Sequence, residues 1–118
     1  ATRTDRNAAG HEVLQLLADY QDRGQAALDA GVPLVRGKPV PIGDGWLRLL
    51  TFDTAASPPT LRVRTYSPHY KAFADELPSY AAWYKAHEAP GESDAAFVAK
   101  DAFSVTLGDF RARFGEPR

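Results

Sequence analysis

Three histidines are the side chains in this 118-residue chain best suited to acid–base or metal chemistry: His11, His69 and His87. Such chemistry requires partners at set spacings, as in the H-E-x-x-H and H-x-x-E-H motifs, and no histidine here lies in one. The pattern favours an exposed turn for His11 and a half-buried place on a helix for His87. His69 follows a strand-like segment, where a contact with a ligand stays open beside a purely structural role.

The acidic side chains occur as local pairs, whereas acid–base catalysis requires carboxylates that converge on one bond. Asp44 lies between Gly43 and Gly45 but is followed by Trp46, where a phosphate-binding loop needs its lysine, so we predict that it is a turn residue. No serine lies in a G-x-S-x-G context. The sequence therefore predicts no catalytic residue on this chain. The pairs, which we expect on the solvated surface, are Asp19/Asp22, Asp75/Glu76 and Glu92/Asp94.

Two groups of side chains could instead form a binding surface. Arg48, Arg62 and Arg64 could form a basic stripe that holds an anion, although a solvated outer sheet face is the favoured interpretation. The tyrosines and tryptophan of residues 77–88 could form an aromatic patch, but aromatic residues at helical spacing more often belong to the core.

Composition limits the class of protein. Apolar residues make up 44% of the chain and charged residues 25%, which is typical of a soluble globular domain. The formal charge of −1 offers no basic field to attract nucleic acid. The longest apolar run is far below the roughly 20 residues of a membrane span. We therefore expect neither a nucleic-acid partner nor a membrane span.

The chain has no methionine and no cysteine, and its first ten residues contain no apolar signal-peptide segment. We therefore expect residues 1–118 to be a single domain or a C-terminal segment cut from a longer gene product. The absence of cysteine also excludes a disulfide scaffold and a thiolate metal site.

The clearest predicted element is a central hairpin of residues 45–52 and 60–66. In its second strand Leu61 and Val63 alternate with Arg62 and Arg64, which places the apolar and the charged side chains on opposite faces. Residues 12–20 fit both a helix and a strand, and periodicity alone slightly favours the helix.

The remaining elements follow from spacing and from turn residues. Apolar residues recur at helical spacing over 77–88, while residues 102–107 alternate as a strand. Asp109 is a candidate N-cap for a last short turn, and the three prolines of residues 32–42 favour extended backbone. We predict an α+β fold of mostly antiparallel sheet with one or two short helices.

Several segments together resemble the C-terminal part of bacterial exported calcineurin-like metallophosphoesterases. The most specific are GDGWLRLLTFD at residues 43–53 and LRVRTYSP at residues 61–68. Residues 28–42 and 71–100 fall outside the resemblance. Further matching segments are residues 2–5, 7–10, 13–21 and, as FSVTLGDFRARF, 103–114.

The resemblance implies part of a β-sandwich, and it implies that residues 12–20 are a strand. In that family two metals clamp the attacking and leaving oxygens of a phosphate ester and activate a bridging water. The metal-binding motifs of the family are absent here: Gly10-His11-Glu12-Val13 lacks the second histidine of G-H-x-H. The resemblance thus implies a divalent metal pair in the complete enzyme, with no ligand, cofactor or catalytic residue on this chain.

Three hypotheses for function follow, of which the least favoured is a metal-free enzyme built around His69 or His87, since no base–nucleophile pair is visible. In the first, this chain is the structural C-terminal part of a phosphoesterase that is exported to the periplasm or secreted, and it associates with the missing N-terminal half or with itself. It would line the substrate cleft near residues 66–69, which makes Tyr66 and His69 the candidate substrate-binding residues. In the second, the chain is an independent, non-catalytic module that binds a ligand or a protein through the face of Trp46 and the arginines or through the aromatic helix.

Overall fold

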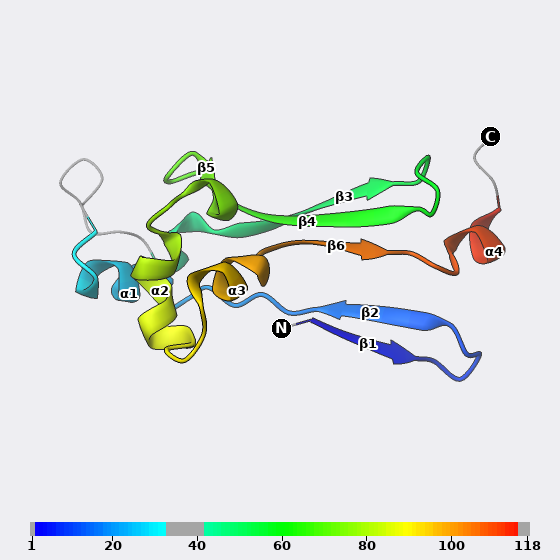
Figure 1. Ribbon diagram of the computed structural model, residues 1–118, viewed down its shortest axis with the longest axis horizontal. Helices are drawn as coiled ribbons and strands as arrows, with labels where there is room; N and C mark the ends of the chain where they lie inside the picture. Colours follow the sequence, from blue (N-terminus) through cyan, green and yellow to red (C-terminus); the bar gives the residue numbers. More distant parts are fainter. Residues whose placement is uncertain (1, 33–41, 116–118) are drawn as a thin grey trace.

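An antiparallel sheet built around strand β4 (Thr60–Ser67) lies along the long axis of the molecule in the computed structural model, which describes residues 2–32 and 42–115 (Figure 1). Strand β3 (Leu47–Asp53) pairs with one side of β4. Strands β5 (Ala72–Phe73) and β6 (Ala102–Thr106) pair with its other side. The predicted hairpin and the predicted final strand are both confirmed.

Alternation along β4 sorts its side chains between two faces. Leu61 and Val63 are 3% and 0% exposed, and Thr65 on the same face is also buried. Arg62 points to the opposite, outward face and is exposed. The inward and outward faces therefore agree with the period-two pattern of the sequence.

A second hairpin, separate from this sheet, consists of β1 (Thr2–Arg6) and β2 (Glu12–Leu16). The Asn7 side-chain oxygen accepts hydrogen bonds from the backbone N–H groups of Ala9 and His11, and Gly10 has a φ of 79°. Residues 12–16 thus form the strand that the resemblance implied and not the helix that periodicity favoured. The strand ends at Leu16, four residues before Tyr20.

The helices are short and more numerous than the one or two expected. Asp109 is the N-cap residue of the last helix, as predicted, but its side chain makes no cap hydrogen bond. Ser93 does cap its helix, because its side-chain oxygen accepts from the Ala96 N–H at 3.2 Å. The described α-helices are α1 (Arg23–Asp29), α2 (Tyr80–Glu88), α3 (Asp94–Ala99) and α4 (Phe110–Phe114), and 3₁₀ turns occupy Ile42–Gly45 and Ala74–Glu76.

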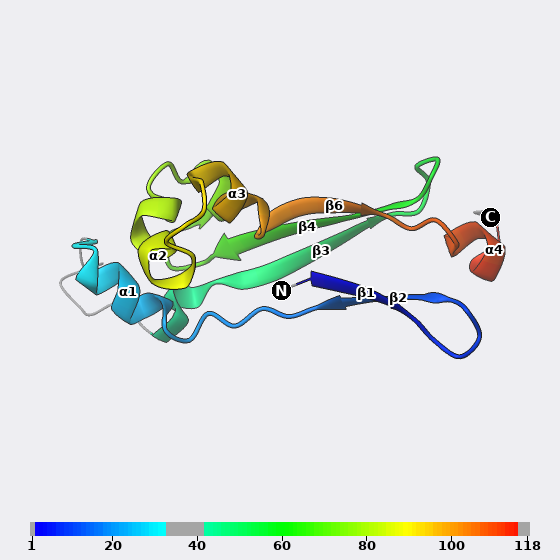
Figure 2. The same ribbon diagram turned by 60° about the horizontal axis from the view of Figure 1, so that its bottom comes forward.

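The core lies at one end of the sheet, where α1, α2 and α3 gather in both views (Figure 1, Figure 2). Tyr80 and Tyr84 of α2 are fully buried, and their rings meet the buried Trp46 edge-on. The aromatic residues of this helix are therefore core and not a surface patch. His87, which we expected to be half-buried, is exposed.

The other end of the sheet is thin. Of the residues that the structure describes, α4 and the turns of the two hairpins lie there (Figure 2). The molecule measures 52 × 30 × 22 Å, with a Cα radius of gyration of 17.1 Å, whereas a compact domain of this length has about 13 Å. Large apolar side chains on β2, β3 and α4 consequently stay exposed; they include Leu49 at 40%, Leu50 at 46%, Phe52 at 56% and Phe114 at 65%.

The α+β fold with mostly antiparallel sheet is confirmed. The predicted extended, proline-rich segment falls almost entirely on residues 33–41, outside the described residues. No helix within residues 2–32 and 42–115 has the length and apolar character needed to cross a membrane.

Candidate functional site

The two predicted substrate-binding residues lie close in sequence but in different surroundings. Tyr66 is on the outward face of β4, where its ring packs against Phe73 with 5.0 Å between the centroids. His69 follows the strand in a turn, and its ring meets Tyr70 edge-on at 4.8 Å. Its buried Nε2 has no hydrogen-bond partner in the described part of the chain. Substrate binding by Tyr66 and His69 stays a prediction.

The proposed basic stripe of three arginines does not exist. Arg48 pairs in register with Thr65, whose side chain is buried on the inward face, whereas Arg62 and Arg64 point outward. Arg64 is already engaged, because it donates to Asp75 Oδ1 at 2.7 Å and to Glu76 Oε1 at 2.8 Å. The outward face is therefore the solvated surface that the sequence favoured.

A buried ionic cluster lies instead beneath the inward face. Asp101 accepts a hydrogen bond from Arg23 Nη2 at 3.1 Å and from Arg48 Nη2 at 2.8 Å. The side chains of Arg23, Arg48 and Asp101 are 5%, 10% and 5% exposed. Glu88, at the rim of the cluster, takes a bidentate pair from Arg23 at 2.6 and 2.8 Å.

Two tyrosines complete the ring of donors around the Asp101 carboxylate. The Tyr20 hydroxyl donates to Oδ1 at 3.0 Å, and the Tyr80 hydroxyl donates to Oδ2 at 2.8 Å. Arg23 also donates to the Tyr80 hydroxyl. Both carboxylate oxygens therefore have two donors each, which is the satisfaction that a buried charge requires.

Five separate segments of the chain supply these side chains. Arg23 begins α1, Tyr80 begins α2, Arg48 lies on β3, and Asp101 lies between α3 and β6. Tyr20 comes from the connection after β2, where its backbone oxygen also accepts the Arg23 N–H at 3.1 Å. The cluster thus joins the helical end of the molecule to the sheet.

The charges of the cluster are stabilised by one another. Burial alone would raise the pKa of Asp101, but the Arg23 guanidinium and the hydrogen bonds from Tyr80, Arg23 and Tyr20 hold that pKa below its ordinary value. Burial likewise opposes the charge on Arg23, yet Glu88 and the neighbouring oxygens raise its pKa. Burial raises the pKa of Tyr80 above its ordinary range. At neutral pH Arg23 and Asp101 are therefore charged and Tyr80 is protonated.

Next to this cluster is a pocket of about 570 Å³, a size typical of small-molecule sites. Arg48, Tyr20 and Asp101 line its polar side, and Phe97, Phe103, Val105 and Leu17 line its apolar side. Lys100 and Asp19 lie at its exposed rim.

A second buried polar group surrounds Asp44, which lies in a 3₁₀ turn, as predicted, and is fully buried. Asp44 has a φ of 51° and is flanked by Gly43 at 75° and Gly45 at 67°. Its Oδ2 accepts from the Tyr84 hydroxyl at 2.6 Å, and that hydroxyl accepts from Trp46 Nε1 at 3.0 Å. Burial raises the pKa of Asp44 above its ordinary value. This group fixes the turn before β3 against α2.

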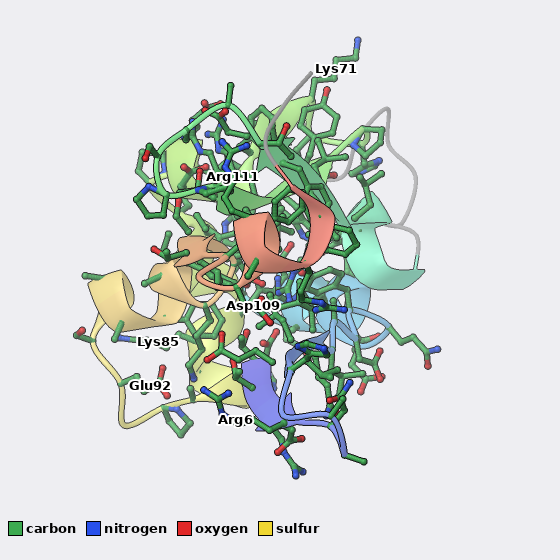
Figure 3. All side chains as sticks on the ribbon, turned by 90° about the vertical axis from the view of Figure 1, so that its right-hand side faces the viewer. Arg6, Lys71, Lys85, Glu92, Asp109 and Arg111 are labelled. Atoms are coloured by element: carbon green, nitrogen blue, oxygen red, sulfur yellow. The ribbon has the colours of Figure 1, made fainter. Side chains whose placement is uncertain are left out.

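Other ion pairs lie at the periphery. Lys85 pairs with Asp94 and Lys100 with Glu92, and Figure 3 shows Lys85 and Glu92 at the edge of the molecule. Arg111 of α4 donates to the backbone oxygen of Thr54 at 2.7 Å. Such exposed pairs contribute little to stability compared with the buried cluster.

One sequence signal could have identified the cluster. Arg48 interrupts an otherwise apolar inward row of Trp46, Leu50 and Phe52, and a charge in such a row needs a buried partner. The partner itself could not have been found, because Asp101 lies 53 residues away.

The described residues 2–32 and 42–115 contain no group of three or more His, Cys, Asp or Glu side chains placed to hold a metal ion. They therefore do not fit the metal pair that the resemblance implies for the complete enzyme. Comparison of the chain with protein-family models, with curated proteins and with solved structures found no match.

Proposed function

We propose that this chain is the C-terminal structural part of a calcineurin-like metal-dependent phosphoesterase. The complete protein hydrolyses phosphate esters, and this chain supplies scaffold but no catalytic group. The resemblance of residues 43–53 and 61–68 motivates the proposal. The observation that carries it is the uncovered apolar surface of the long sheet.

That surface has the character of an interface with another polypeptide. Leu49 is exposed on the outward face of β3, and Leu50 and Phe52 are exposed on its inward face. Strand β3 is also an edge of its sheet, so one row of its backbone groups is open to a further strand. A protein that stays monomeric in water seldom leaves such a surface uncovered.

The partner is the N-terminal half of the phosphoesterase or, in its absence, a second copy of this chain. The divalent metal pair belongs to that half, Tyr66 and His69 line the substrate cleft, and the complete enzyme is exported to the periplasm or secreted.

The proposal is tested by phosphatase assays with p-nitrophenyl phosphate and added Mn²⁺, Fe³⁺ or Zn²⁺. The isolated chain is expected to give no metal-dependent hydrolysis, whereas the complete gene product hydrolyses the ester. A G-H-x-H motif encoded a few residues before Ala1 would support the assignment further. Robust metal-dependent hydrolysis by the isolated chain would contradict it.

A second candidate function is an independent, non-catalytic binding module, and the pocket of about 570 Å³ beside Arg48 is the observation that favours it. The predicted binding face of Trp46 and the arginines cannot serve this role, since Trp46 is buried and Arg48 points inward. A monodisperse monomer with a cooperative melt would favour the module over the phosphoesterase segment.

A further inference from the structure

We propose that the pocket beside Arg48 binds a small organic oxyanion, a carboxylate or phosphate monoester with an apolar body. This inference does not depend on the phosphoesterase assignment, because it rests only on side chains of this chain.

Arg48 is the member of the cluster whose donors are not all used. Its Nε is buried and has no hydrogen-bond partner within the described residues, and its Nη1 makes only a long contact of 3.3 Å with the Leu17 oxygen. Arg23, by contrast, uses all three of its guanidinium nitrogens. A buried donor without an acceptor is costly, so an acceptor brought by a ligand would be favoured here.

The charges around Arg48 favour an anion over a neutral acceptor. Within the buried part of the cluster, two guanidinium groups share the single carboxylate of Asp101. Glu88 compensates Arg23 and not Arg48. At the exposed rim, Lys100 is already paired with Glu92 and Asp19 adds a negative charge, and both rim charges are screened by solvent.

The apolar lining of the pocket favours a ligand that also has an apolar body. Phe103 and Val105 of β6 and Phe97 of α3 present apolar surface, and the Arg48 guanidinium lies 6.0 Å from the centre of the Phe103 ring. An aromatic or short aliphatic body would pack there while its oxyanion pairs with the guanidinium. The site therefore selects an amphipathic anion rather than inorganic phosphate.

The test uses the full chain and titrates it with 4-phenylbutyrate, phenyl phosphate and the neutral control 4-phenyl-1-butanol. Binding is followed by ¹H–¹⁵N NMR, with the Arg48 Nε–H signal as the specific reporter. We expect saturable binding of at least one anion, with a Kd of about 1 mM, a shift of the Arg48 Nε–H signal, and affinity for the alcohol at least about tenfold weaker. Comparison of the two anions tells a carboxylate from a phosphate ligand.

Two matched variants of α3 locate the site without altering the cluster. Ala99 is exposed and lines the pocket, so Ala99→Trp should block it and weaken binding at least about tenfold. Ala95 is exposed on the same helix away from the pocket lining, so Ala95→Trp should bind as the wild type does. The proposal is overturned if neither anion saturates, if the alcohol binds equally well, if the Arg48 signal does not move, or if both variants bind alike.

Discussion

The stability of the helical end of the molecule depends chiefly on the carboxylate of Asp101. Both arginines of the cluster and two tyrosine hydroxyls donate to it. Asp101→Asn removes the anion but keeps the shape, and leaves Arg23 and Arg48 short of negative charge. We expect the free energy of unfolding to fall by about 3–5 kcal/mol, measured by urea denaturation.

The control for this variant is Asp75→Asn, which breaks the pair with Arg64 on the outward face. That loss should stay below about 1 kcal/mol because the pair is partly exposed. Equal losses of unfolding free energy in the two variants would show that the buried cluster contributes no more to stability than the partly exposed pair.

The lowered pKa of Asp101 makes the stability of the fold depend on pH in the acidic range. Because the folded-state pKa lies below the ordinary value of 3.8, the stabilisation is fully present above that value and is lost as the pH falls through the folded-state pKa. We expect urea denaturation between pH 2 and pH 6 to show that the free energy of unfolding falls more steeply below about pH 4 for the wild type than for Asp101→Asn. Parallel pH curves for the two proteins would refute this contribution.

The hydroxyl of Tyr84 serves two buried partners at once. It donates to Asp44 and accepts from Trp46 Nε1. Tyr84→Phe removes this hydroxyl and leaves Asp44 and Trp46 Nε1 without it as a hydrogen-bond partner. The free energy of unfolding, measured by urea denaturation, should fall by about 1–3 kcal/mol. Tyr66→Phe, on the outward face of β4, is the matched control and should have a much smaller effect.

At the scale of single elements, the start of α3 offers a clear test. The Ser93 side chain accepts from the Ala96 N–H, whereas Ser79, the N-cap residue of α2, makes no side-chain cap hydrogen bond. Ser93→Ala should therefore cost about 1 kcal/mol of stability and Ser79→Ala close to nothing. Thermal unfolding followed by circular dichroism measures both, and equal costs would contradict the capping difference.

The elements that the sequence predicted best are those with a clean period. The alternation of Leu61 and Val63 with Arg62 and Arg64 correctly placed β4 and its faces. Residues 12–16 were harder to predict, because a short apolar run fits both the helical and the strand period. Only pairing with β1 makes this segment a strand. His87 was misplaced because the buried stripe of α2 consists of Tyr80, Ala81 and Tyr84 and does not continue to His87, although the helical spacing does.

At the scale of the whole molecule, the exposed apolar surface predicts self-association. The average mass in static light scattering should rise with protein concentration, because burying residues such as Leu49 and Phe52 removes apolar area from water. Placing lysine at these two positions of the edge strand should shift the mass toward the monomer. Ser104→Lys, at an exposed position of β6, is the control and should leave association unchanged. A wild-type mass independent of concentration would contradict this expectation.

The sequence by itself determined the α+β class, the central hairpin and the lack of a recognisable set of catalytic residues, since these follow from local spacing and residue types. The tertiary structure alone decided which charges are buried. Arg23 and Asp101 are 78 residues apart, and Arg48 and Asp101 are 53 apart. No local period links them, because their pairing depends on how the helices fold back onto the sheet. The candidate pocket lies beside those buried charges, so it too could be found only in the folded chain.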